Sequence, residues 1–109
     1  MTAPETDAQL ATRLAVETGR LLVEARRHLF DGGASTWDVK DAGDAIAQEF
    51  LMREFTEHRP DDAVLSEEGR EDPRRFDADR VWIVDPLDGT REYSEVGRSD
   101  WAVHIALWE

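Results

Sequence analysis

The sequence contains no cysteine, no long apolar run and few basic residues, and each absence excludes a class of protein. Without cysteine, a disulfide scaffold and cysteine-ligated zinc or iron–sulfur sites are ruled out. The apolar runs are only a few residues long, and the acidic N-terminal stretch lacks the basic and apolar segments of a signal peptide. We therefore expect a cytoplasmic protein without a membrane span or a leader.

The chain is strongly acidic. Its 109 residues carry 13 lysines and arginines against 25 aspartates and glutamates, a formal net charge of −12. Such a chain repels phosphate backbones and anionic lipids, so nucleic-acid polymers and membranes are excluded as partners, whereas cations are attracted. The 40% of hydrophobic residues suffices for a packed core, and the length provides one domain at most.

Two amphipathic helices are predicted at the start of the chain. Leucines recur at helical spacing from Thr6 onward, Thr6 and Gln9 have the spacing of a capping box, and residues 31–33 end the pattern. A second apolar stripe follows Asp44 and ends at Pro60, which cannot continue a helix. The first part of the chain is therefore expected to be helical.

Three short apolar runs follow, over residues 63–65, 81–84 and 101–108, and predict strands. The charged stretch 69–79 between the first two is expected to be a solvated loop. Two helices followed by the first strands of a sheet indicate an α+β or layered α/β/α protein, truncated after the last strand. His104, in that strand, is expected to be packed or hydrogen-bonded rather than a metal ligand, because the histidines show no ligand-pair spacing.

Carboxylates gather where two of these strands end. Asp85 and Asp88, in the segment Asp-Pro-Leu-Asp-Gly-Thr, are three residues apart at a sharp turn and can converge on one hard cation. Gly89 permits close backbone approach, and a helix starting after it would direct free N–H groups at a phosphate. Glu67 and Glu68 follow the preceding strand and would meet the aspartates at one sheet edge. Carboxylates gathered at one edge would repel one another unless a divalent metal neutralised them. The spacing of these residues alone also fits ordinary turns and a solvated acidic loop.

The two acidic motifs together carry a family resemblance. The segments 65–69 and 81–93, their spacing and the two preceding helices resemble the magnesium-dependent, lithium-sensitive inositol monophosphatase family. The final run 101–108 and the DPLDGTREY form are most similar to its CysQ branch, the 3′(2′),5′-bisphosphate nucleotidases. The resemblance implies a layered sugar-phosphatase-like fold and hydrolysis of 3′-phosphoadenosine 5′-phosphate to AMP in sulfate assimilation. Inositol 1-phosphate remains an alternative substrate.

The resemblance also implies the cofactor and its ligands. Two or three Mg²⁺ ions would bind, with Li⁺ inhibitory, and the substrate would be a small phosphorylated molecule. Glu67 would bind the first metal, Asp85 would bridge two metals, and Asp88 would bind the second. The backbone carbonyl of Leu87 would complete the ligands. Because family members are often dimers, a homodimer is expected.

The remaining implied roles concern the phosphate and the attacking water. Asp88, Gly89 and Thr90 would bind the substrate phosphate. Asp44 and the Thr90 hydroxyl would orient the water, and Glu68 would help to hold a water at the metal. Water would attack phosphorus directly, without a covalent enzyme intermediate.

Length and motif spacing leave two alternatives open. Members of the family are more than twice as long, and their second half supplies a third metal-binding aspartate. We therefore expect residues 1–109 to be the N-terminal portion of a phosphatase domain whose C-terminal half is absent, which leaves an inactive metal-binding fragment as an alternative. The haloacid-dehalogenase-like phosphatases have a similar Asp-x-Asp-Gly-Thr signature. Their aspartates are two residues apart, whereas Asp85 and Asp88 are three apart, which disfavours that class.

Overall fold

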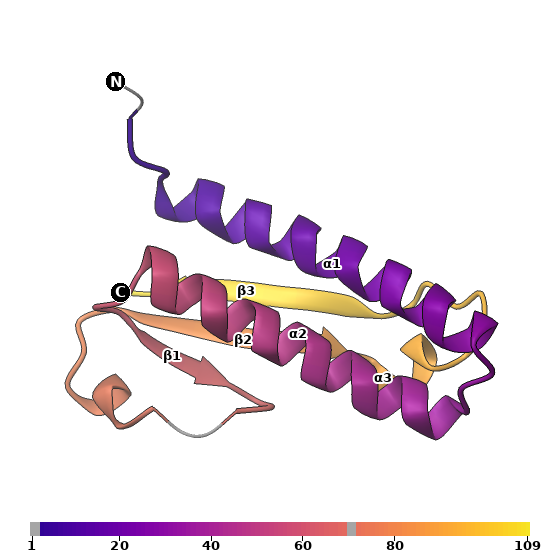
Figure 1. Cartoon of the computed structure of the whole chain (residues 1–109). Coiled ribbons are helices and arrows are strands. Elements are labelled where there is room, and N and C mark those ends of the chain that lie inside the picture. Colours follow the sequence, from indigo (N-terminus) through magenta and orange to yellow (C-terminus); the bar gives the residue numbers. More distant parts are fainter. Residues whose placement is uncertain (1–2, 70–71) are drawn as a thin grey trace.

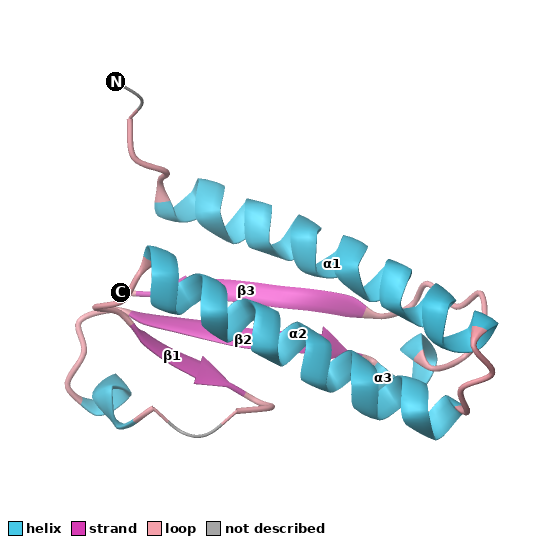
Figure 2. Cartoon of the chain, viewed as in Figure 1, coloured by secondary structure: helices cyan, strands magenta, loops and turns pink. Residues whose placement is uncertain are grey.

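The computed structural model describes residues 3–69 and 72–109, in which two long helices lie over one face of a small sheet (Figure 1). The strand order is β1-β2-β3, with β1 and β2 parallel and β2 and β3 antiparallel (Figure 2). This arrangement confirms the predicted two helices followed by a sheet. In chain order the elements are α1 (Asp7–Asp31), α2 (Thr36–His58), β1 (Ala63–Ser66), η1 (Pro73–Phe76), β2 (Val81–Asp88), α3 (Thr90–Tyr93) and β3 (Ala102–Trp108).

Helix α1 begins where its capping box predicts. The Thr6 hydroxyl accepts a hydrogen bond from the Gln9 N–H at 3.1 Å, and the Gln9 side chain accepts one from the Thr6 N–H at 2.9 Å. The helix buries Leu10, Leu14 and Leu22 against α2 and the sheet. Over the described ranges, no helix combines the length and hydropathy needed to cross a membrane.

Helix α2 begins well before Asp44, so the predicted start of this helix is wrong. Ser35 caps the helix by accepting from the Asp38 N–H at 3.1 Å, and Asp38 accepts in return from the Ser35 N–H at 3.2 Å. The first turns contribute little apolar surface, since Trp37 is 70% exposed, and therefore lack the stripe on which the prediction depended. Asp44 lies inside the helix, half-buried, rather than at its start.

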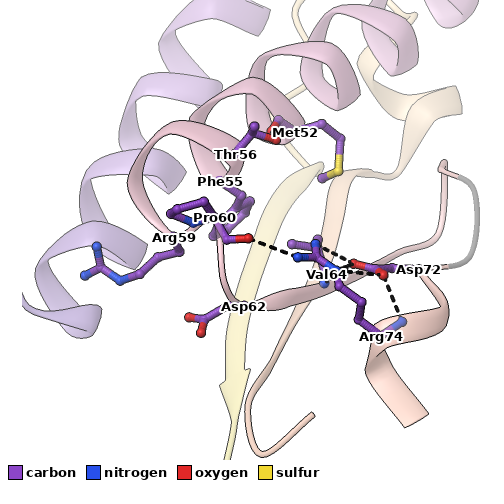
Figure 3. A pocket seen from close by; sticks show the side chains of 9 residues that line it. All are labelled: Met52, Phe55, Thr56, Arg59, Pro60, Asp62, Val64, Asp72 and Arg74. Atoms are coloured by element: carbon purple, nitrogen blue, oxygen red, sulfur yellow. Dashed lines mark hydrogen bonds and ion pairs between the residues drawn. The ribbon is translucent and has the colours of Figure 1, made fainter. Parts of the chain in front are cut away.

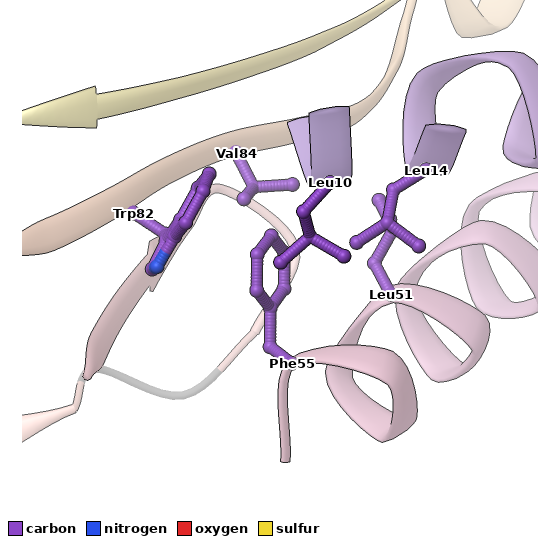
Figure 4. Close-up of a cluster of buried hydrophobic side chains, with 6 residues drawn as sticks. All are labelled: Leu10, Leu14, Leu51, Phe55, Trp82 and Val84. Atoms are coloured by element: carbon purple, nitrogen blue, oxygen red, sulfur yellow. The ribbon is translucent and has the colours of Figure 1, made fainter. Parts of the chain in front are cut away.

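The main core lies between the two long helices and β2 (Figure 4). The Trp82 ring lies 5.0 Å from the Phe55 ring, and its indole N–H donates to Asp62 at 2.9 Å. On the sheet face away from the helices, by contrast, Ile83 is 44% and Trp108 is 55% exposed. Burial thus alternates along β2 from Trp82 to Pro86, and one face of the sheet carries most of the packing. The buried members of this core are Leu10, Leu14, Leu51, Phe55, Trp82 and Val84.

Strand β2 continues to Asp88, beyond the predicted end at residue 84. Asp85 pairs with His104 and Asp88 with Ala102, so three steps along β2 match two steps along β3. This β-bulge accommodates Pro86, whose missing N–H argues against a regular strand, and it places both aspartates on the sheet face away from the helices. The predicted loop 69–79 contains the short helix η1, and Arg70 and Glu71 within it lie outside the described residues.

Candidate metal and phosphate site

The parallel pairing of β1 and β2 brings the first acidic motif beside the second. Ser66 pairs with Val84, and the Glu67 N–H donates to the Val84 carbonyl at 3.3 Å. The turn carrying Glu67 and Glu68 therefore starts next to Asp85. This confirms the prediction that the residues following both strands share one edge of the sheet.

A glutamine on α2 holds this turn. The Ser66 hydroxyl donates to Gln48 Oε1 at 2.6 Å and accepts from the Glu68 N–H at 3.4 Å. At Gly69 a Cβ atom would lie 2.3 Å from Gln48 Nε2, so glycine lets the turn approach the helix. Gln48 was not predicted from the sequence, because a lone polar residue on a helix belongs to no motif.

The half-buried Asp44 faces the start of α3. The Thr90 hydroxyl donates to Asp44 Oδ1 at 2.9 Å and lies 3.4 Å from the Leu87 carbonyl oxygen. Helix α3 begins at Thr90, directly after Gly89 at φ +86°. The predicted partners Asp44 and Thr90 are thus in contact, with the Leu87 carbonyl nearby.

The carboxylates of this region repel one another. Burial raises the pKa of Asp44, the charges of Asp41 and Asp85 raise it further, and the hydrogen bond from Thr90 partly opposes them. The pKa of Glu68 is raised by partial desolvation, then by the charges of Asp44, Asp85 and the neighbouring Glu67. The positive charge of Lys40 lowers the pKa of Asp44 only as the smallest of these contributions. Negative charge gathered in this way attracts a cation.

The Asp85 side chain fits a metal ion. Its Oδ1 atom is buried, and no hydrogen-bond donor within residues 3–69 and 72–109 reaches it. A buried acceptor left unsatisfied costs about 1–3 kcal/mol, which a bound cation would offset. A hollow of about 320 Å³ is lined by Asp41, Asp44, Ala45, Gln48 and Glu68, and its carboxylates supply the oxygen ligands that Mg²⁺ prefers.

Two of the expected ligands are exposed, unlike the buried Asp85 Oδ1 atom. Glu67 is exposed, and Asp88, also exposed, has its Oδ2 atom 3.0 Å from His104 Nε2. The hydrogen bond confirms the expected role of His104. Among the described residues, the group whose three ligand atoms all lie within 4.8 Å of one another is on α2, not at the motifs. It consists of Glu54, Glu57 and His58.

A second hollow, of about 300 Å³, lies between the end of α2 and β1 (Figure 3). Its polar groups bind one another: Asp72 accepts from the Val64 N–H at 3.2 Å and pairs with Arg74 at 3.0 Å. Arg74 also donates to the Pro60 carbonyl at 2.9 Å. Neither acidic motif lines it, so this hollow is held by contacts that stabilise the fold.

These observations define the class of the protein. The chain belongs to the inositol monophosphatase family, whose sequence model matches residues 3–109. It is 53% identical over 105 residues to the 3′-phosphoadenosine 5′-phosphate phosphatase of Mycobacterium leprae (strain TN), covering 95% of this chain and 38% of that protein. The protein of the same name from Mycobacterium bovis (strain ATCC BAA-935 / AF2122/97) is 52% identical over 92 residues, covering 84% and 34%. The chain thus spans little more than a third of the length of these curated relatives.

Solved structures share the fold. The extragenic suppressor protein suhB from Bartonella henselae aligns with a TM-score of 0.72 and 31% identity, covering 90% of this chain and 37% of that one. Inositol monophosphatase-II from Staphylococcus aureus MSSA476 aligns with a TM-score of 0.76 over 91% of this chain and 36% of that one. At 24% identity the second likeness shows the fold alone. The predicted family and fold class are confirmed.

Proposed function

We propose that this chain carries the metal and phosphate site of a Mg²⁺-dependent phosphomonoester hydrolase acting on 3′-phosphoadenosine 5′-phosphate. The observation that carries the proposal is the buried Asp85 Oδ1 atom, which has no hydrogen-bond donor among the described residues and lies near Asp44 and Glu68. The substrate is inferred from the relatives at 52–53% identity, which are 3′-phosphoadenosine 5′-phosphate phosphatases.

In this proposal the metal ligands are Glu67, Asp85, Asp88 and the backbone carbonyl of Leu87. Bound Mg²⁺ would supply Lewis-acid stabilisation of the departing oxygen and lower the pKa of water. Asp85 is central, because its buried Oδ1 has no other partner in the described part of the chain. Glu67 and Asp88 are both exposed, so an ion can reach their carboxylates without a loss of packing.

The Thr90 hydroxyl is suited to orient the attacking water. Its proton is donated to Asp44 Oδ1, so the hydroxyl oxygen is left with lone pairs that accept a hydrogen bond from water. Glu68, which lines the same hollow as Asp44, provides a further acceptor. In the same proposal, Asp88 and the backbone N–H groups of Gly89 and Thr90 hold the substrate phosphate, and water attacks phosphorus without a covalent intermediate.

Several finer features belong to the same proposal. Residues 1–109 would be the N-terminal portion of the phosphatase domain, supported by the 38% of the Mycobacterium leprae relative that the chain covers. The enzyme would be cytoplasmic, lithium-sensitive and dimeric, and would take part in sulfate assimilation. Inositol 1-phosphate is the competing substrate, and a metal-binding fragment without activity is the competing function.

Phosphate release from 3′-phosphoadenosine 5′-phosphate and from inositol 1-phosphate tests the proposal. The chain is assayed with Mg²⁺, with and without Li⁺, beside Asp85→Asn. The matched control is Glu57→Gln, which alters the carboxylate group on α2 instead. We expect Mg²⁺-dependent, Li⁺-inhibited release from the nucleotide that is lost only in Asp85→Asn.

The other outcomes discriminate among the alternatives. Preference for inositol 1-phosphate would replace the substrate while keeping the site. Mg²⁺ binding without release, measured by titration calorimetry, would favour the inactive fragment. Equal Mg²⁺ binding by the chain and by Asp85→Asn would refute the site itself.

A further inference from the structure

His104 contacts one of the proposed metal ligands. It lies on β3 opposite Asp85, and its Nε2 atom is 3.0 Å from Asp88 Oδ2. The β-bulge makes this contact possible, because it pairs Asp88 with Ala102 and so places it on the same sheet face as His104. His104 packs into neither hydrophobic core cluster, and its side chain is 60% exposed.

The chemistry of the two groups determines which of them donates the hydrogen bond. An ionised carboxylate only accepts hydrogen bonds, so the short contact requires an N–H on His104 Nε2. Mg²⁺ prefers oxygen ligands to imidazole, which makes His104 a donor to the ligand rather than a ligand itself. With Oδ2 engaged, the other Asp88 oxygen, Oδ1, is left for a metal.

We propose that His104 is a positioning residue for Asp88, holding Oδ2 so that Oδ1 is presented to the second metal. This inference rests on the proposed function, since it needs Asp88 to bind metal. Partners that orient metal ligands typically contribute about 10–100-fold to metal affinity. His104 would then act through Asp88 without touching the metal or the substrate.

The test measures Mn²⁺ binding by electron paramagnetic resonance, with Mn²⁺ standing for Mg²⁺, and needs no catalytic activity. We expect His104→Ala to weaken binding about 10–100-fold and His104→Gln, whose amide N–H can replace the imidazole donor, to restore most of it. Asp88→Asn is the positive control. The matched negative control is His58→Ala, because His58 is also an exposed histidine, 3.1 Å from the Glu54 carboxylate.

A melting curve for each variant separates positioning from folding, since a positioning role predicts an unchanged melting temperature. Binding by His104→Ala equal to that of the unaltered chain, with Asp88→Asn weakened, would overturn this inference and leave the proposed function intact. Failure of His104→Gln to rescue His104→Ala would also overturn it. Unaltered Mn²⁺ binding in Asp88→Asn, or weakened binding in His58→Ala, would overturn both, because the ion would then be bound elsewhere.

Discussion

Replacing Gly43 by alanine should push α2 away from α3. A Cβ atom at Gly43 would lie 2.5 Å from Tyr93 Cε1 and 3.1 Å from Leu87 Cδ2, well inside contact distance. The ring cannot swing aside, because Tyr93 is fully buried and its hydroxyl donates to the Leu22 carbonyl at 2.6 Å. Gly43 precedes Asp44, so any displacement also acts on the bond from Thr90 to Asp44.

The size of the effect follows from two opposing contributions. Alanine is favoured over glycine in a helix interior by about 0.8–1.0 kcal/mol. Overpacking a filled core costs about 1–3 kcal/mol, and the locked ring places this site toward the upper end. The free energy of unfolding of Gly43→Ala should therefore fall by up to about 2 kcal/mol.

Urea unfolding followed by tryptophan fluorescence measures this change. The matched control is Gly19→Ala in α1, where an added Cβ meets nothing within 4 Å. That variant should gain up to about 1 kcal/mol from helix propensity alone. If both glycine variants were stabilised alike, the close approach of α2 to Tyr93 described above would be refuted.

Two further predictions concern the polar contacts of the site. Because burial raises the pKa of Asp44 above its usual 3.8, its charge destabilises the metal-free fold at neutral pH. Asp44→Asn should thus unfold at higher urea concentration than the unaltered chain at pH 7, and the gap should close as acidification protonates Asp44; a pH-independent gap would contradict this. Ser66→Ala, which leaves Gln48 Oε1 without its donor, should lower the free energy of unfolding by about 1–3 kcal/mol, whereas the exposed control Ser99→Ala should change it by less than about 0.5 kcal/mol. Equal urea midpoints for the two serine variants would count against the Gln48 contact.

Local signals predicted local structure well. The start of α1 follows from Thr6 and Gln9, which bond each other directly. The adjacency of Glu67 to Asp85 follows from the rule that neighbouring parallel strands end at one sheet edge. These features were predictable because each depends on residues near in sequence or on a general rule of sheet topology.

Features set by tertiary contact were not predictable. Gly43 and Gln48 matter because of Tyr93 and Ser66, which are distant in sequence. The start of α2 was missed because its capping residues precede turns that bury little apolar surface. The length of β2 was missed because Pro86 counts against a strand unless a bulge accommodates it.

The bulge between Asp85 and Asp88 also determines which sheet face each aspartate projects from. In a regular strand, residues an odd number of positions apart project to opposite faces, so these two aspartates share a face only because one position is taken out of the alternation. With the bulge retained, one residue gained or lost between them would reverse that arrangement and turn Asp88 toward the helices. The number of residues between Asp85 and Asp88 is therefore more strictly constrained than the identity of their side chains. Family members that place both aspartates on one sheet face should differ in this segment by substitution rather than by insertion or deletion.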